Sequence, residues 1–411
     1  MTSIDERLAA AGLPPLPRTA WLEIDLDALR GNLAALRTMA GTNVPIHPVV
    51  KADAYGHGAV PVALALEAAG ADGFCVATID EALALREGGV RAPIRVLFPS
   101  PPAFAAEAAA AGIALSAGER TMLDELLRAV AGSVGRDPAA PLRIELEVET
   151  GLGRGGFVPE AVVDAAKAIA ATGTAELAGL WTHMQATEDA PRTRAQLQRF
   201  DQAAAALRDA GLGLPTRHVA ASGGLFTNLA ALDGVRPGLA IYGLVPDELD
   251  AGTLDPAAVA AFRPVMSLHA RPVRVADLPA GHGISYGPTF TTRRPSRIAT
   301  LPLGYGDGFV RAFSNRAEAL VRGIRVPLVG NVAMDALMVD VTDVPGSPVT
   351  HQDEFVLLGV QGHERIRAED LARTRTTNTW EVVTQMAARL PRVYHAAAAP
   401  VSLRTLTARR G

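Results

Sequence analysis

Residues 44–243 repeat one pattern eight times: a short apolar run ends at a polar or glycine turn, and a helical stretch follows. Stretches with apolar spacing near 3.6, such as 79–89 and 192–211, separate the runs. Eight β-then-α units indicate an α/β fold, a (β/α)8 TIM barrel. The rival is a doubly wound open sheet, but no G-x-G-x-x-G turn follows the first run. The runs are VPIHPVV (44–50), GFCVAT (73–78), PIRVLF (93–98), GIALS (112–116), LRIELEV (142–148), ELAGLWTHM (176–184), TRHVAAS (216–222) and GVRPGLAIYG (234–243).

After residue 257 the runs become short, alternating and rich in Val, Pro and Gly, which predicts a second, mostly β domain. We therefore expect the barrel over residues 20–257, followed by a mostly β C-terminal domain over 258–411. The run TAWLEIDLDAL (19–29) precedes the first barrel strand and is a candidate to pair with the second domain. One helix is expected within residues 378–390.

Bulk composition excludes several classes of protein. A hydrophobic fraction of 49% is ordinary for a globular enzyme, and the single cysteine, Cys75, excludes an intrachain disulfide. The net charge of −4, without a basic block, argues against a nucleic-acid surface. The N-terminus lacks a basic segment followed by an apolar one, and the stretch 104–118 is too short and weakly apolar to span a bilayer. We expect a cytoplasmic protein that binds neither nucleic acid nor membrane.

All but two of the 39 basic Lys and Arg residues are arginines. Arg stays protonated at working pH, so it replaces Lys as a surface charge but not as a nucleophile or imine-forming group. Lys167 lies in a helical stretch (159–173), where a solvated charge is the ordinary interpretation. Lys51 directly follows the first apolar run and is therefore the candidate reactive lysine.

Further polar residues follow the predicted strands at the carboxyl end, where chemistry gathers in such barrels. Arg154 follows the fifth run and His183 ends the sixth. Ser222 follows the seventh, while Arg236 and Gly238 lie in the eighth, near the usual phosphate site. Each residue alone is compatible with a structural role, but their convergence on one rim indicates a phosphorylated ligand, a reactive lysine and two guanidinium groups.

The segment VVKADAYGHG (49–58) resembles the pyridoxal-phosphate lysine motif of bacterial alanine racemases. The resemblance covers both predicted domains, nearly the whole chain, and the lysine, SYG and YGDG motifs are its most specific parts. It continues in the family's order through ETGLGRGGF (149–157), GLWTHMQATED (179–189), GVRPGLAIYGL (234–244), GISYGPTF (283–290), LPLGYGDGF (301–309) and GNVAMD (330–335).

The resemblance implies an isomerase that interconverts L- and D-alanine with pyridoxal 5'-phosphate, and it implies no metal. Lys51 would form the imine and act as one base, and Tyr286 of the partner subunit would be the second. The enzyme would thus be a homodimer with shared active sites. Tyr55, Ser222 and the backbone near Gly238 would hold the cofactor phosphate. Arg236 would face the pyridine nitrogen, and His183 would link Arg236 to the second catalytic group. Substrate contacts would come from Arg154, at the carboxylate, and from Tyr305, Met334 and Asp335 of the partner subunit.

The chemistry of racemisation explains why these residue types are needed. A proton must leave one face of Cα and return to the other, so two groups on opposite faces act in turn as base and acid. Both Lys51 and Tyr286 need a lowered pKa to work near neutral pH, and a cationic network of His183, Arg236 and Arg154 would favour the tyrosinate. Arg236 cannot release its proton and would leave the pyridine nitrogen neutral, which favours proton return to Cα.

Several positions depart from the family pattern. Trp380 stands where the family usually has a tyrosine that touches the cofactor phosphate, and an indole has no hydroxyl. Glu147 stands where many members have a carbamylated lysine, so we predict an ion pair with Arg154; an ordinary strand glutamate is the alternative, because Glu145, Glu147 and Glu149 alternate. Ala221 and Ala333 replace a frequent Asn and a frequent Cys, which leaves the substrate range open.

Three alternatives to alanine racemisation remain. The first is racemisation of another or a broader range of amino acids, such as serine. The second is a non-catalytic pyridoxal-phosphate-binding protein, but such proteins resemble the barrel alone and lack the second domain with its tyrosine. The third is a decarboxylase of related fold, in which an arginine holding the substrate carboxylate would work against the reaction.

Overall fold

The computed structural model describes residues 3–133, 140–249, 252 and 254–407, and the chain divides into two compact units. The barrel unit comprises Arg30–Ala54 and Ala59–Arg263. The β unit comprises Met1–Leu29, Tyr55–Gly58 and Pro264–Gly411. The barrel unit thus begins at Arg30, later in the chain than the barrel expected over 20–257.

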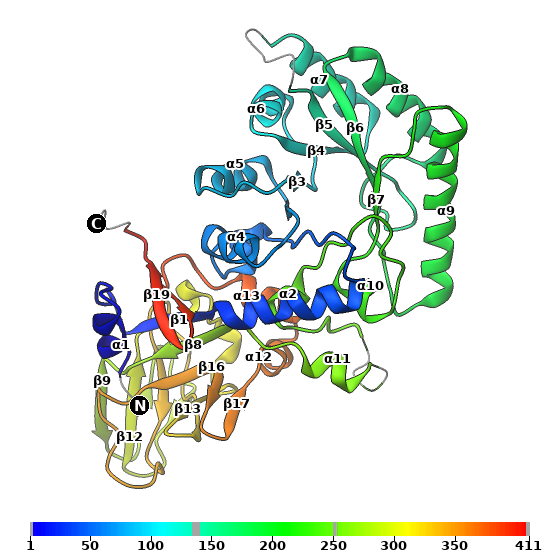
Figure 1. Ribbon diagram of the computed structural model, residues 1–411. Helices are drawn as coiled ribbons and strands as arrows, with labels where there is room; N and C mark the ends of the chain where they lie inside the picture. The colour runs from blue at the N-terminus through cyan, green and yellow to red at the C-terminus, as the bar shows by residue number, and fades with distance from the viewer. Residues whose placement is uncertain (1–2, 134–139, 250–251, 253, 408–411) are drawn as a thin grey trace. The chain divides into compact units, whose positions relative to one another are not determined.

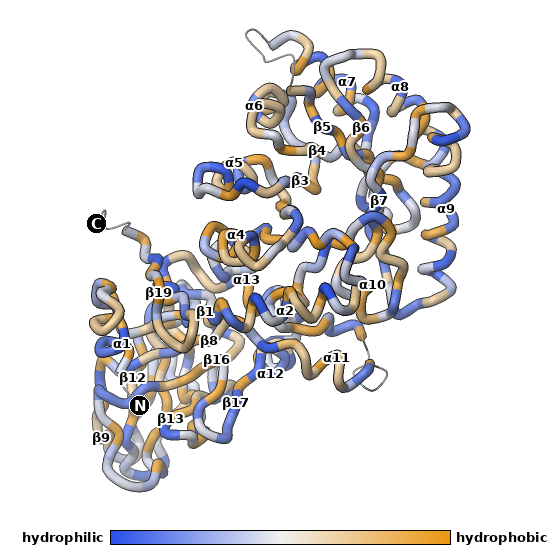
Figure 2. Tube along the Cα trace, in the orientation of Figure 1, coloured by the Kyte–Doolittle hydropathy of each residue, from blue (hydrophilic) through white to orange (hydrophobic). Residues whose placement is uncertain are grey.

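The barrel unit contains six parallel strands, each paired with the next in sequence (Figure 1). Their short, buried segments match six of the eight predicted runs, and their apolar cores are visible in the hydropathy trace (Figure 2). The strands are β2 (Phe74–Val76), β3 (Ile94–Val96), β4 (Ile113–Ala117), β5 (Leu142–Glu147), β6 (Ala175–Trp181) and β7 (Thr216–His218).

The first and eighth predicted runs are extended segments that close the ring through isolated parallel bridges. Prolines in both runs, Pro48 and Pro237 among them, lack the N–H that a regular ladder needs, although their carbonyls accept from Cys75 and Val49. The predicted (β/α)8 barrel is confirmed. The bridges join Val49 to Cys75, Ile46 to Val235 and Ala221 to Arg236.

Helices surround the strands of the barrel unit (Figure 1). In α7 the buried residues Leu123, Leu126, Leu127 and Val130 follow the helical period, so one stripe faces the core. The principal helices are α2 (Leu26–Ala40), α4 (Ala59–Ala68), α5 (Ile79–Glu87), α6 (Ala105–Ala110), α7 (Arg120–Ala131), α8 (Val162–Thr172), α9 (Ala190–Asp209), α10 (Ser222–Phe226) and α11 (Pro256–Ala260). In the part of the chain that the structure describes, no helix combines the length and apolarity needed to cross a membrane.

The β unit is built mainly from short strands, as predicted, with α1 (Ile4–Ala10), α12 (Ala368–Arg375) and α13 (Thr379–Thr384). Its largest sheet has the order β14-β13-β16-β8-β1-β18-β19, and a second sheet has the order β15-β12-β9. The strands are β1 (Ala20–Asp25), β8 (Met266–Ala270), β9 (Arg274–Leu278), β10 (Gly283–Ile284), β11 (Phe290–Thr291), β12 (Ser296–Leu301), β13 (Glu318–Val321), β14 (Ile324–Pro327), β15 (Leu337–Asp340), β16 (Phe355–Gln361), β17 (Glu364–Ile366), β18 (Arg392–Ala396) and β19 (Ala399–Arg404).

Strand β1 explains why the N-terminal segment belongs to the β unit. It pairs antiparallel with β8 and parallel with β18, so the expected pairing of the run 19–29 with the second domain is confirmed. Its wholly buried Trp21 packs with Ile4 and Leu8 of α1 and with Val393 of β18. These hydrogen bonds and contacts tie residues 3–29 to the C-terminal sheet, whereas the sequence placed the start of the barrel domain at residue 20.

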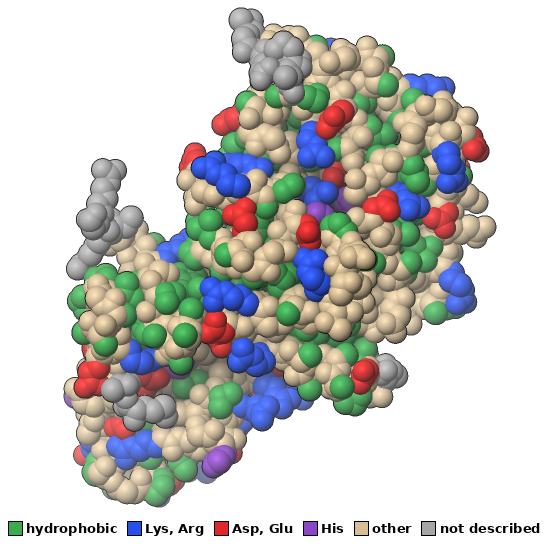
Figure 3. Space-filling model, viewed as in Figure 1, with side chains coloured by type: hydrophobic (Ala, Val, Ile, Leu, Met, Phe, Trp, Pro, Cys, Tyr) green, Lys and Arg blue, Asp and Glu red, His purple; other side chains and the backbone are tan. Residues whose placement is uncertain are grey.

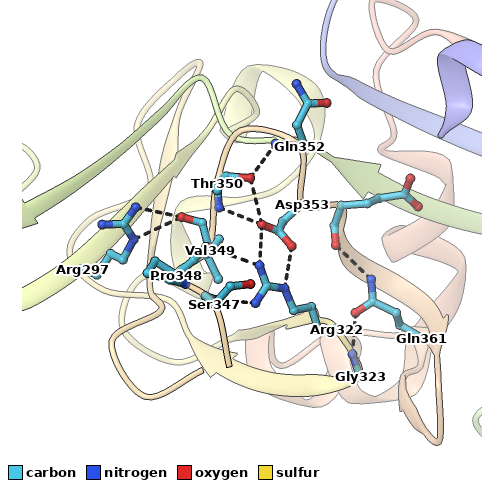
Figure 4. A network of polar contacts seen from close by, with 11 residues as sticks. Arg297, Arg322, Gly323, Ser347, Pro348, Val349, Thr350, Gln352, Asp353 and Gln361 are labelled. Carbon is cyan, nitrogen blue, oxygen red and sulfur yellow. Dashed lines mark hydrogen bonds and ion pairs between the residues drawn. The ribbon is translucent and has the colours of Figure 1, made fainter. Parts of the chain in front are cut away.

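Two arginines hold the loop before β16 (Figure 4). Arg322 pairs with Asp353 at 2.6 Å and donates to the carbonyl of Ser347. Arg297 donates through Nε and Nη2 to the carbonyl of Val349, at 3.1 and 3.0 Å. Guanidinium donors thus satisfy loop carbonyls that no strand pairs with.

Candidate active site

Lys51 opens a turn whose backbone has the left-handed conformation. Ala52, Asp53, Ala54 and Tyr55 all have φ between 52° and 55°, although none is glycine. The carboxylates of two acidic residues hold the turn: Glu81 accepts from the amide of Ala52 at 2.5 Å, and Asp53 accepts from that of Ala59 at 2.8 Å. The surrounding contacts therefore enforce a strained connection directly after the candidate lysine. Tyr55, at its end, is buried and belongs to the β unit.

Lys51 lies in a positively charged environment. Burial first, and then the charge of Arg154, lowers the pKa of its amine from the ordinary value. Burial, followed by Arg236, Arg154 and Lys51, lowers the pKa of His183 to about 3. His183 is thus neutral near pH 7, and the expected cationic network consists of Arg154 and Arg236 without it. Figure 3 shows basic (Lys or Arg), acidic and histidine side chains gathered near the middle of the visible face of the barrel unit.

Glu147 and Arg154 form the predicted ion pair, with 3.5 Å between Oε1 and Nη2. The Arg154 guanidinium also lies 5.2 Å from the ring centre of Phe98. Burial raises the pKa of Glu147, while Arg154 opposes the shift. Glu149 anchors the same loop, because its carboxylate accepts from the amides of Gly151 and Gly153.

A buried glutamine on α9 joins two of these loops. Gln196 donates to Thr150 Oγ1 at 3.0 Å and to the carbonyl of His183 at 3.2 Å. Its Oε1 accepts from the amide of Gln185 at 2.9 Å. The segment carrying Arg154 and the segment carrying His183 are therefore tied to one side chain that is 1% exposed.

The ends of the seventh and eighth segments meet at Ser222. Its hydroxyl accepts from the amides of Gly238 at 3.0 Å and Ala240 at 3.2 Å. Glycine at position 223 leaves room for the neighbouring side chain, because an added Cβ would lie 2.6 Å from Thr187 Oγ1 and displace it. The arrangement gathers a hydroxyl and backbone amides, the groups that bind phosphate oxygens.

Arg236 is fully enclosed in the barrel unit. Its guanidinium donates to the carbonyls of His218 and Thr182, each at 2.8 Å, and hydrogen-bonds Nδ1 of His218. It lies 5.1 Å from the ring centre of Trp181. The imidazole that hydrogen-bonds Arg236 is thus that of His218, a residue that the sequence analysis did not single out.

The β unit gathers the four residues predicted to come from the partner subunit. Asn331, in the loop that continues to Met334 and Asp335, donates through its side chain to the carbonyl of Tyr286 at 2.8 Å. Backbone bonds from Tyr305 to Ala333 and from Gly306 to Met334 join the second loop to the first. Tyr286 is 80% exposed, an unusual exposure for a large aromatic residue.

The predicted site residues thus fall into two groups. The β unit holds Tyr55, Tyr286, Tyr305, Met334 and Asp335. The sequence analysis assigned no site role to Glu145, Gln196 and His218, whose roles depend on contacts between segments distant in sequence. Trp380 lies partly buried on α13. Within the described ranges, no cluster of three or more His, Cys, Asp or Glu is arranged to hold a metal. The barrel unit brings together Lys51, Arg154, His183, Ser222, Arg236 and Gly238.

Comparison with known proteins identifies the class. Residues 24–246 match the family model "Alanine racemase, N-terminal domain", and residues 265–394 match "Alanine racemase, C-terminal domain". An alanine racemase of Symbiobacterium thermophilum is 40% identical over 381 residues, covering 92% of this chain and 97% of that one. One of Thermobifida fusca is 40% identical over 377 residues, covering 90% and 96%.

Solved structures agree with this class. The alanine racemase of Bacillus anthracis with bound L-Ala-P has a TM-score of 0.86 at 31% identity, covering 95% of this chain and 99% of that one. The alanine racemase of the D-cycloserine producer Streptomyces lavendulae has a TM-score of 0.83 at 36% identity, covering 93% and 98%. The fold and site therefore define an isomerase, an amino-acid racemase. The chain belongs to the alanine racemase family.

Proposed function

We propose that this chain interconverts L- and D-alanine with pyridoxal 5'-phosphate, using Lys51 and Tyr286 of the partner subunit as the two bases. The observation that carries the proposal is that Lys51, Arg154 and Arg236 lie in the barrel unit, whereas Tyr286 lies exposed in the β unit. The relatives named alanine racemase support alanine as the substrate. The cytoplasmic location stays a prediction.

The donor groups of Lys51, Ser222 and Arg236 in the barrel unit, and of Tyr55 in the β unit, fit the cofactor. Lys51 supplies a primary amine with a lowered pKa, and Ser222 with neighbouring amides, together with the hydroxyl of Tyr55, would hold the phosphate. Arg236 would face the pyridine nitrogen. When bound, pyridoxal phosphate acidifies the Cα–H bond of an attached amino acid. Arg236 keeps its proton, which leaves the ring nitrogen neutral and favours proton return to Cα.

Two residues would move the proton. Lys51 takes or returns it on one face of Cα, and its lowered pKa makes the neutral amine more available. Tyr286 acts on the other face, so each residue is the base in one direction and the acid in the other. Arg154, held by Glu147, would orient the substrate carboxylate, and Tyr305, Met334 and Asp335 of the partner subunit would line the pocket.

The decisive experiment is chiral analysis of L-alanine, D-alanine and L-serine incubated with the purified holoenzyme. We expect racemisation of alanine in both directions, and a loss of at least ~100-fold in Lys51→Ala and Tyr286→Phe, as for removal of acid–base groups. Serine racemised as fast as alanine would favour the broader-range alternative. A Tyr286→Phe variant that works normally in both directions would rule out the two-base proposal.

A further inference from the structure

The partly buried Arg95 on β3 and three buried side chains form a continuous polar chain within the barrel unit that ends at Arg236. The Nε of Arg95 pairs with Glu145 Oε1 at 2.7 Å. Glu145 Oε2 lies 3.1 Å from His218 Nε2, and Nδ1 of the same ring meets Nη1 of Arg236. Glu145, His218 and Arg236 are each at most 2% exposed, so water does not replace these contacts.

The direction of each hydrogen bond follows from the chemistry of the groups. A guanidinium donates and never accepts, so Nδ1 of His218 must present its lone pair to Arg236. Burial lowers the pKa of His218 to about 4, with Glu145 opposing and Arg236 reinforcing the shift. The ring is therefore neutral near pH 7 and carries its one proton on Nε2. That N–H donates to Glu145, so the carboxylate selects the tautomer that Arg236 requires.

The strands are built around this carboxylate. A Cβ added to Gly179, its neighbour on β6, would lie 2.8 Å from Glu145 Cδ, so only glycine leaves room for it. The register of β5 against β6 shifts between Ile144 and Glu145. Trp181 stacks on His218 with 6.2 Å between ring centres and 8° between planes. The bulge, the glycine and the stacked ring together hold Glu145 and His218 in fixed positions.

We infer that Glu145 is a positioning residue for the racemase site: by fixing the Nε2–H tautomer of His218, it holds Arg236 in place as a cation that only donates. Its catalytic consequence rests on the proposed function, because Arg236 is there the partner of the cofactor ring. The tautomer of His218 is a property of the chain itself and is tested separately.

The variant Glu145→Gln isolates the charge. Arg95 attracts the amide oxygen, which turns the amide NH2 towards His218 and makes Nε2 an acceptor. The ring proton then moves to Nδ1, opposite the N–H of Arg236, and that hydrogen bond is lost. We expect kcat and cofactor affinity to fall by roughly tenfold to a hundredfold, as for other carboxylates that orient a functional histidine.

The test is 15N NMR of the full-length holoenzyme with ring-labelled histidine, using His218→Asn to assign the signals. The wild type should show a protonated Nε2 and an unprotonated Nδ1 at His218, and Glu145→Gln should reverse this pattern. Gly179→Ala, which displaces the carboxylate by contact alone, should disturb it as well. Glu23→Gln is the control, since Glu23 is a partly buried carboxylate of the β unit paired with Arg7 and His395.

The outcomes separate the two hypotheses. A wild-type Nδ1–H tautomer, or an unchanged tautomer in both Glu145→Gln and Gly179→Ala, would overturn the inference. A changed tautomer with full racemase activity and cofactor affinity would also overturn it. A wild type that shows the expected tautomer but racemises no amino acid would instead contradict the proposed function.

Discussion

At the scale of single residues, the proposed role of Arg154 at the substrate carboxylate predicts that the Glu147–Arg154 pair makes substrate binding dependent on pH. Burial raises the pKa of Glu147 above the ordinary 4.5, so on acidification its charge is lost earlier than that of an exposed glutamate. Once Glu147 is protonated, Arg154 has lost the anion that orients it. The glutamate thus serves as a counter-ion within the barrel, and its effect should appear in KM before it appears in kcat.

We predict that Glu147→Gln raises KM for alanine about fivefold at pH 8, the upper end expected for a partly exposed ion pair. The wild-type KM should rise towards that of the variant as the pH falls through the raised pKa of Glu147. The KM of the variant should not rise over the same pH range, because glutamine does not titrate. Initial rates, measured from pH 8 down to the lowest pH at which the holoenzyme stays folded, determine both. The exposed pair Arg143–Glu176, on β5 and β6, supplies the control, since Glu176→Gln should leave KM unchanged. Parallel pH profiles of wild type and Glu147→Gln would contradict the prediction.

At the scale of elements, the left-handed turn after Lys51 has an unfavourable backbone conformation that raises the free energy of the folded chain. Each non-glycine residue in this conformation costs about 1–2 kcal/mol, so its four consecutive residues store about 4–8 kcal/mol that the surrounding packing offsets. Gly56 continues the turn with φ of 80°, and an added Cβ there would meet the carbonyl of Val383 at 2.3 Å. The turn carries the chain from the barrel unit into the β unit directly after the candidate base.

We predict that Ala52→Gly stabilises the protein by about 1 kcal/mol, because glycine adopts positive φ without steric cost. Ala52 is exposed, so little packing is lost. Ala195→Gly, at an exposed position of the right-handed helix α9, should destabilise it by about 1 kcal/mol. Urea unfolding of both variants measures the difference. Equal destabilisation by the two substitutions would mean that the turn is not left-handed in solution.

At the scale of the whole molecule, the candidate site residues divide between two units. Lys51 lies in the barrel unit and Tyr286 in the β unit. The exposure of Tyr286 suits a residue that would complete the active site of a second chain. Shared sites predict complementation, because a dimer of one Lys51→Ala chain and one Tyr286→Phe chain retains one intact pair of bases.

Mixing the two inactive variants under conditions of subunit exchange should therefore restore about a quarter of wild-type activity, since half of randomly formed dimers are mixed and each has one intact site. Racemase assays before and after exchange measure the recovery, with each variant alone as the control. If both bases came from the same chain, every site in the mixture would lack one of them and no activity would return.

The sequence by itself determined the class of fold and the residues with distinctive chemistry. Eight apolar runs predicted the barrel because period and spacing are local properties, and Lys51 was distinguishable because arginine cannot replace it in covalent chemistry. The Glu147–Arg154 pair was predicted from the resemblance to alanine racemases, many of which have a carbamylated lysine at the position of Glu147, and the ion pair is present. These inferences need only the order of residues along the chain.

Only the tertiary structure decided how those residues are supported. Glu145 and His218 are far apart in sequence and meet because β5 and β7 flank β6 in the barrel, so no local pattern distinguishes them from ordinary strand residues. The neutral state of His183 likewise depends on burial beside Arg236 and Arg154. The assignment of residues 3–29 to the β unit depends on the pairing of β1 with β8 on one side and β18 on the other. Each of these results depends on burial and on contacts between distant segments, which the order of residues does not contain.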